Sequence, residues 1–213
     1  WEGLVWPDSV SISLSYSHML QALELLYRLK SVPRTGWLDH EVCGKGTTRP
    51  RDVESVSEHS HTTALLAMML CPPELDRLKV IEMALLHDCT EAVCGDITPE
   101  AYSSVTAEDK QAREEAALTQ VCASVNAAGW QGDRIHALWT ERETGLSPEG
   151  SFVSQIDKLD MLVQAHLYET EHGVDLSEFF SYVEKRGMVT HPALTPLYDT
   201  VRQGRGGEAE AEA

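Results

Sequence analysis

Apolar residues recur near a period of 3.6 along most of the chain, and this spacing places them on one face of an α-helix. Several alternating runs of β-branched residues, the pattern typical of strands, do not occur. The pattern therefore predicts an all-α fold, a helical bundle in a single domain. The expected helices cover residues 13–31, 55–70, 74–94, 107–129, 133–143, 151–173, 176–187 and 192–203.

Local signals mark several of the expected helix ends. Ser55 and Glu58 fit a capping box at the start of the second helix, and the prolines at 72–73 end it. Gly95 and Gly173 are candidate terminators of the third and sixth helices. The third helix is expected to bury an apolar stripe, and the residues predicted as core there are Leu78, Ile81, Met83, Ala84, Leu85 and Leu86.

Two segments are expected to lie outside the helices. Residues 36–54 contain three glycines and a proline without any sustained period, which predicts a long loop. Residues 204–213 are rich in glutamate, alanine and glycine, and this composition predicts a disordered acidic tail. The expected domain is therefore formed by residues 1–203.

The composition narrows the classes of partner and compartment. The 213 residues are 42% hydrophobic, enough for a substantial core, yet no uninterrupted apolar stretch of about 18 residues predicts a membrane span. A net charge of −17 repels polyanions, so we expect no long nucleic acid, whereas a small phosphorylated substrate remains compatible with a local cation. Five irregularly spaced cysteines and the absence of a signal-peptide pattern favour a cytoplasmic protein with free thiols.

The stretch MALLHDCTEAVCGD, residues 83–96, carries the most unusual chemistry. His87, Asp88, Glu91 and Asp96 follow within ten positions at the end of an apolar helix. Acidic side chains are seldom buried unless they are paired or bound to a metal. Either this helix end lies at the surface, or the group holds a cation.

Other ligand-capable residues lie on neighbouring expected helices. His59 begins the second helix, and Asp157 lies in the otherwise apolar FVSQIDKLDMLVQ. Together with His87 and Asp88 they offer nitrogen and carboxylate donors, which suit manganese, cobalt, iron or zinc. A surface role for His59 and a solvated face for Asp157 are equally compatible with the spacing, so both interpretations stay open.

The motifs themselves resemble a known family. LKSVPRTGW, ESVSEHS, MALLHDCTEAVCGDITP, REEAAL and QIDKLDMLVQA occur in the order and at the separations of the HD-domain 5′-deoxynucleotidases, in their eukaryotic-type branch, over roughly residues 15–200. This family belongs to the HD superfamily of metal-dependent phosphohydrolases. The resemblance implies an HD-domain helical bundle that hydrolyses (deoxy)nucleoside 5′-monophosphates to nucleoside and phosphate. It also implies a divalent cation such as manganese, cobalt or magnesium, with zinc or iron as further candidates.

The resemblance also implies roles for the acidic and histidine residues. His59, His87, Asp88 and Asp157 match the ligands of the first metal, the same set that the donor chemistry selects. Glu91 matches the residue regarded as catalytic in the family. In this way the resemblance favours the cation over the surface interpretation of the helix end.

Further residues match the family's substrate site. Arg34 corresponds to the phosphate-binding arginine, and Asp96 to a residue near the sugar. Glu91, Asp96 and the carbonyl of Ile97 are implied to bind a second cation. Trp37 is expected either to contact the base or sugar, or to be a packing anchor.

Two departures from the family pattern concern the surroundings of the site. His61 stands where relatives usually carry an apolar or aromatic residue, and we expect it to pack. The loop at 38–52 is longer than in typical members, which makes the substrate preference less transferable than the chemistry. Family members tend to dimerise, so a homodimer is expected.

Three alternative functions remain open from the sequence. Another HD phosphohydrolase, such as a cyclic-nucleotide phosphodiesterase or a nucleoside triphosphate hydrolase, is the first, although Arg34 as the one obvious phosphate cation favours a monophosphate. A two-iron oxygenase needs extra histidines between His87 and Asp157, where only His136 occurs. A non-catalytic metal- or nucleotide-binding module is the third.

Overall fold

The computed structural model describes residues 16–40, 42, 53–98 and 104–205. Within these residues the chain forms helices and no strand, which confirms the all-α prediction. In chain order the elements are α1 (Tyr16–Tyr27), the 3₁₀ helix η1 (Arg28–Ser31), α2 (Thr35–Asp39), α3 (Val56–Leu70), α4 (Arg77–Leu86), α5 (Glu91–Cys94), α6 (Ala107–Ala127), α7 (Gly132–Thr144), α8 (Pro148–His172), α9 (Ser177–Arg186) and α10 (Thr195–Gly204).

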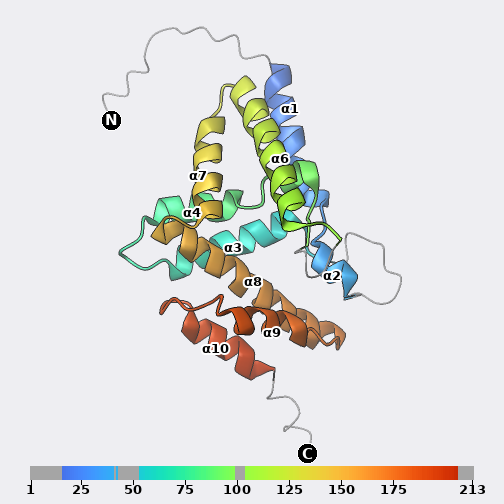
Figure 1. Ribbon diagram of the computed structural model, residues 1–213, viewed down its shortest axis with the longest axis vertical. Coiled ribbons are helices and arrows are strands. Elements are labelled where there is room, and N and C mark those ends of the chain that lie inside the picture. The colour runs from blue at the N-terminus through green and yellow to red at the C-terminus, as the bar shows by residue number, and fades with distance from the viewer. Residues whose placement is uncertain (1–15, 41, 43–52, 99–103, 206–213) are drawn as a thin grey trace, which may run out of the picture.

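Helix α8 crosses the middle of the molecule. Figure 1 shows α1, α6 and α7 on one side of it and α9 and α10 on the other, with α3 and α4 packed against its first half. Neighbours on several sides explain why α8 buries apolar residues around much of its circumference, among them Phe152, Ile156, Leu159 and Leu162. A polar residue in this helix is therefore placed in the core, where it needs a partner.

Helix α3 begins as the sequence predicts. The Oγ of Ser55 accepts a hydrogen bond from the backbone N–H of Glu58 at 3.2 Å, and the Glu58 carboxylate accepts one from the Ser55 N–H at 2.7 Å. This reciprocal pair is the predicted capping box. It fixes the first turn of α3 so that His59 shares the buried face with Val56 and Thr63.

The predicted third helix is wrong as one continuous element. Helix α4 ends at Leu86, residues 87–90 form turns, and the short helix α5 begins at Glu91. The Nδ1–H of His87 donates to the Ala84 carbonyl at 2.8 Å and so satisfies one of the last carbonyls of α4. Because the helix breaks here, His87 and Glu91 are not held on one helical face as the spacing suggested.

The apolar stripe predicted for the same segment is also wrong in part. Leu78 and Leu85 are 67% and 48% exposed, whereas Met83 and Ala84 are buried as expected together with Val80. The face that packs against α3 and α8 is the one carrying 80, 83, 84 and 87. Hydrophobicity alone selected the leucines, but the neighbouring helices decide which face is buried.

The remaining boundaries are close to expectation. Gly95 and Gly173 terminate α5 and α8 with φ of 76° and 65°, the positive range that glycine adopts without strain. The predicted loop at 36–54 begins within the short helix α2, and its residues 43–52 lie outside the described residues. The domain boundary at 203/204 and the acidic tail stay predictions, because residues 206–213 are not described. No described helix is both long and apolar enough to cross a membrane.

We expect Ser55→Ala to lower the free energy of unfolding by about 1 kcal/mol, the usual contribution of an N-cap side chain. Ser57→Ala, one turn position away and without a capping role, is the matched control. Urea denaturation of both variants measures the difference. Equal stability of Ser55→Ala and the native protein would show that the capping box does not stabilise α3.

Candidate metal centre

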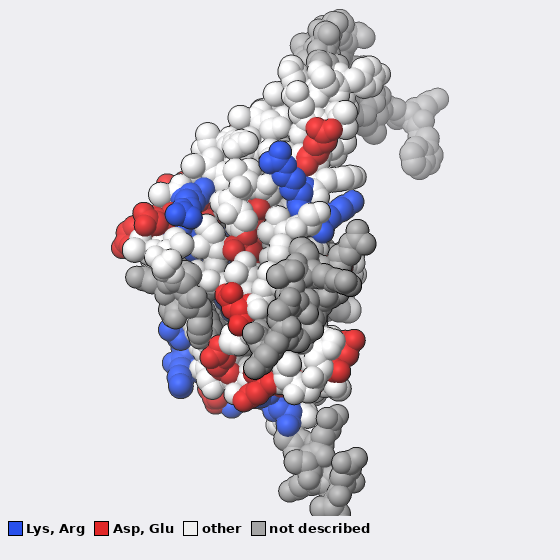
Figure 2. All heavy atoms as spheres, turned by 90° about the vertical axis from the view of Figure 1, so that its right-hand side faces the viewer, with Lys and Arg blue, Asp and Glu red and all other residues white. Residues whose placement is uncertain are grey.

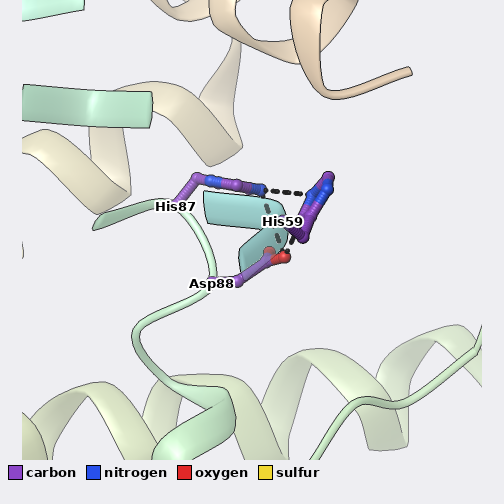
Figure 3. Close-up of side chains that lie close together, drawn as sticks. All are labelled: His59, His87 and Asp88. Carbon is purple, nitrogen blue, oxygen red and sulfur yellow. Dashed lines mark hydrogen bonds and ion pairs between the residues drawn. The ribbon is translucent and has the colours of Figure 1, made fainter. Parts of the chain in front are cut away.

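Three segments bring the predicted ligands together. His59 comes from the first turns of α3, His87 and Asp88 from the turn after α4, and Asp157 from the middle of α8. The His59 and His87 Nε2 atoms are 3.2 Å apart, and Asp88 Oδ2 lies 3.1 Å from His87 Nε2. Asp157 Oδ1 lies 3.4 Å from His59 Nε2. Figure 3 shows His59, His87 and Asp88 pointing toward one another.

These residues fit a divalent cation. One donor atom from each of His59, His87 and Asp88 lies within 4.8 Å of the others. Ligand atoms that share an ion at about 2.1 Å lie roughly 3 to 3.5 Å from one another, the range observed here. The mixture of imidazole nitrogen and carboxylate oxygen suits a borderline divalent metal, and it does not single out one element.

The two histidines are held in the tautomer that a metal requires. The Nδ1–H of His59 donates to Asp160 Oδ2 at 2.8 Å, as the Nδ1–H of His87 donates to Ala84. Both acceptors are oxygens without hydrogen, so the Nδ1 atoms carry the protons and the Nε2 atoms face each other. Two nitrogen lone pairs this close need a proton or a metal ion between them.

Burial and charge set the protonation of the centre. Burial and the Arg34 charge oppose a proton on His59, but hydrogen bonds to Asp157 and Asp160 outweigh them and raise its pKa to about 9. Burial alone would raise the pKa of Asp157, yet Lys158, His59, His87 and Arg142 hold it well below its usual range. The centre therefore combines ionised carboxylates with a proton that a cation can replace.

Glu91 lies beside the ligands but differs from them. It is 4% exposed, and its Oε2 is buried without a hydrogen-bond partner in the structure. Burial raises its pKa well above the usual value, and the negative charges of Asp88 and Asp96 add to this shift. A carboxyl group with an unsatisfied buried oxygen is suited to exchange a proton with a bound molecule.

Arg34 links the ligands to the next acidic residue. Its Nη1 is 3.1 Å from Asp88 Oδ2 and 3.8 Å from Asp96 Oδ1. The backbone N–H of Thr35 donates to the Asp96 carboxylate, and the Thr35 hydroxyl donates to the Asp96 carbonyl at 2.8 Å. The start of α2 is therefore fastened to the segment after α5, with the guanidinium between them.

Ile97, the third residue of the expected second cation site, already has a cationic partner. Its carbonyl accepts a hydrogen bond from Lys110 Nζ at 2.7 Å, and the same ammonium lies 3.5 Å from Glu114. Lys110 thus brings a positive charge from α6 to the side of the cavity that Asp96 occupies.

Trp37 lies at the other side of the centre and is 2% exposed. Its indole N–H donates to Glu54 Oε1 at 2.7 Å, and its ring contacts Phe179 and Tyr168 with centroid distances of 4.7 and 5.4 Å. Of the two roles left open by the sequence, this geometry matches the packing anchor.

All of these residues border a single cavity of about 490 Å³ between α2, α5, α6, α7, α8 and α9. This volume is in the range of small-molecule sites. Figure 2 shows acidic side chains gathered along the middle of one face, with basic side chains around them. The chemistry of the ligands and the size of the cavity together indicate a site for a small molecule bound through a metal.

The sequence profile of the HD domain matches residues 26–194, which include every residue of this centre. The chain belongs to the HD-domain family. Among its relatives, the 5′-deoxynucleotidase HDDC2 of Homo sapiens is 34% identical over 196 residues, which cover 92% of this chain and 90% of the relative. The 5′-deoxynucleotidase hdd1 of Schizosaccharomyces pombe is 34% identical over 188 residues, covering 86% and 88%. These relatives place the chain within the HD-domain 5′-deoxynucleotidases, as the motifs predicted.

A solved structure supports the same fold. A conserved hypothetical protein from Pyrococcus furiosus is 28% identical and superposes with a TM-score of 0.66 over 86% of this chain and 99% of its own. This similarity confirms the expected HD-domain helical bundle.

The HD-domain structure contains site residues that the sequence reasoning missed. Asp160 orients His59, Arg142 donates to Asp157 Oδ2 at 3.0 Å, and Glu54 forms a second acidic group with His59 and Asp160. Asp160 carried a signal, since an acid three residues after Asp157 in an apolar helix shares its face. Arg142 and Glu54 gave none, because their contacts join segments far apart in sequence. The packing role expected for His61 is wrong, because its side chain is exposed on α3.

We expect Asp160→Asn to weaken metal binding by about 10- to 100-fold, because the carboxylate orients His59 and increases its basicity. Isothermal titration of the protein with manganese measures the affinity. Glu171→Gln removes one charge from an exposed position on the same helix and serves as the control. Unchanged affinity in Asp160→Asn would remove Asp160 from the support of the centre.

Proposed function

We propose that this chain is a metal-dependent 5′-deoxynucleotidase, which hydrolyses deoxynucleoside 5′-monophosphates to nucleoside and phosphate. The observation that carries the proposal is the buried donor group of His59, His87 and Asp88 beside the unpartnered Glu91 carboxyl oxygen. Membership of a family whose relatives are 5′-deoxynucleotidases supports the same reaction.

His59, His87, Asp88 and Asp157 would hold the divalent cation, with manganese, cobalt or magnesium as the proposed metals and zinc or iron compatible with the donors. When bound, such an ion supplies Lewis-acid polarisation of a phosphoryl oxygen and eases deprotonation of water. Asp160 and the Ala84 carbonyl keep the imidazole Nε2 atoms aimed at the ion. Arg142 and Lys158 keep the Asp157 carboxylate ionised.

Glu91 would exchange the proton of the reaction. Its buried Oε2 accepts a proton from the attacking water or donates one to the departing 5′ oxygen, two roles that the same carboxyl can perform in succession. The raised pKa of Glu91 brings its proton affinity nearer to neutral pH than that of an exposed glutamate. A carboxyl without another partner is free to perform either transfer.

Arg34 would bind the phosphate. A guanidinium offers five donors in one plane, and Arg34 reaches both Asp88 and Asp96 through Nη1. The remaining donors suit two oxygens of a phosphate dianion, and the group keeps its charge at every working pH.

Asp96 would accept a hydrogen bond from the sugar hydroxyl. The Thr35 N–H fixes one of its oxygens and leaves the carboxylate at the border of the cavity. A second cation bound by Glu91, Asp96 and the Ile97 carbonyl is the further role proposed for this corner, and it requires Lys110 to release that carbonyl.

A cytoplasmic location and a homodimer complete the proposal. The four described cysteines, Cys71, Cys89, Cys94 and Cys122, are free thiols, as a reducing compartment favours. Sedimentation of the purified protein tests the dimer.

We expect phosphate release from deoxynucleoside 5′-monophosphates only after manganese, cobalt or magnesium is added to chelator-treated protein. The panel should include ribonucleoside monophosphates, dATP and a 3′,5′-cyclic nucleotide, with products separated by chromatography. Faster cleavage of dATP or of the cyclic nucleotide would replace the proposed reaction by another HD phosphohydrolase activity. Bound metal without hydrolysis of any member would indicate a binding module.

We expect Glu91→Gln to retain its metal and to lose at least about a hundredfold in turnover, because the amide cannot exchange the proton. Elemental analysis measures the metal, and phosphate release measures turnover. Glu114→Gln, which changes a carboxylate of the same cavity that lies beside Lys110, should keep most of its activity. Full turnover in metal-loaded Glu91→Gln would exclude Glu91 from the chemistry.

A further inference from the structure

The cavity continues beyond the metal centre along α8. Met161 lies one turn after Asp157, about 6 Å along the helix axis, and also borders the cavity. Beyond it, α9 contributes Phe179 and Tyr182, which are three residues apart and therefore share a helical face. Aromatic rings and a thioether thus line this end of the cavity.

The opposite end has a different character. Lys110 and Glu114 of α6 and Glu143 of α7 border it, and the first two lie 3.5 Å apart. Charged side chains that are paired with one another lose hydration and partners if an uncharged planar group displaces water from them. The two ends therefore favour different parts of a ligand.

Phe179 is held firmly in its position. Its ring lies 4.7 Å from Trp37 at an interplanar angle of 34° and 4.8 Å from His40 at 62°. Trp37 is itself fixed by its hydrogen bond to Glu54, and His40 lies 2.6 Å from Glu178 on α9. The partly buried Phe179 ring is thus a rigid surface backed by the fully buried Trp37.

We propose that the nucleobase of the substrate binds at this end of the cavity, against the Phe179 ring and over Met161, and that Phe179 determines the affinity for nucleosides. The inference rests on the proposed function only for the place of the phosphate, at the metal centre. Aromatic rings attract the face of any base, so stacking gives affinity with little preference among bases. Arg186 lies over the Tyr182 ring with its guanidinium carbon 4.1 Å from the centroid, which makes Phe179 the principal surface.

Two ligands that differ only in the base test this inference. Deoxyadenosine 5′-monophosphate and 2-deoxyribose 5-phosphate share the phosphate and the deoxy sugar. Their affinities for manganese-loaded Glu91→Gln protein are measured by isothermal titration, which needs no turnover. We expect the nucleotide to bind about tenfold more tightly than the sugar phosphate, the size of a base–aromatic contact.

Adding Phe179→Leu should remove most of that tenfold difference by weakening the nucleotide alone. Leucine keeps apolar contact with Trp37 and removes the aromatic face, whereas Phe179→Tyr should keep the difference. Tyr27→Leu, which changes an exposed aromatic on α1 outside the cavity, is the matched control and should leave both affinities unchanged.

Three outcomes would overturn the inference. Equal weakening of both ligands in Phe179→Leu would show that the ring only supports the site, and no weakening would place the base elsewhere. Equal affinity of the two ligands before substitution would exclude a base contact. Should Phe179→Leu fail to fold, Met161→Ala tests the same end from α8, again with loss expected for the nucleotide alone. Turnover of the native protein is a separate readout, so a protein that shows this binding pattern without hydrolysis overturns the proposed function but not the base site.

Discussion

Several buried carboxylates surround one buried histidine, and the rest of the structure depends on supplying them with positive charge. Asp157 and Asp160 come from a helix that is covered on several sides, and both approach His59. Ionised groups in such a place are stable only if they are paired or bound to a cation. Arg34, Arg142 and Lys158 supply part of the charge, and the facing Nε2 atoms of the two histidines mark the place of the remainder.

The fold positions this centre through helix ends rather than helix faces. The capping box places His59 in the first turns of α3, and the break after α4 releases His87 and Asp88 from the rotation that a continuous helix would impose. Because α5 starts only at Glu91, this carboxyl approaches the centre from a different direction than the ligands. The same arrangement leaves an open cavity whose charged and aromatic ends meet at the metal centre.

Much of this could be predicted from the sequence because the signals are local. Ser55 and Glu58 define the start of α3 within four residues, and the donor chemistry of His59, His87, Asp88 and Asp157 selects residues that the fold brings together. The break at 87–90 could not be predicted, because the helical pattern runs through it and only a tertiary environment favours the turn. Asp160 was read as a possible solvated position, since its burial depends on the neighbours of α8. The exposed Leu78 and Leu85 show the same limit, as does Phe179, whose contacts with α2 join distant segments.

The most direct test of the account is the position of a bound metal. Crystals of the protein soaked with cobalt or manganese and measured at the absorption edge of the metal would locate it by anomalous scattering. The account predicts a peak between His59 Nε2 and His87 Nε2, within bonding distance of Asp88 and Asp157. A protein that binds metal in solution but shows its anomalous peak away from these four side chains would contradict it.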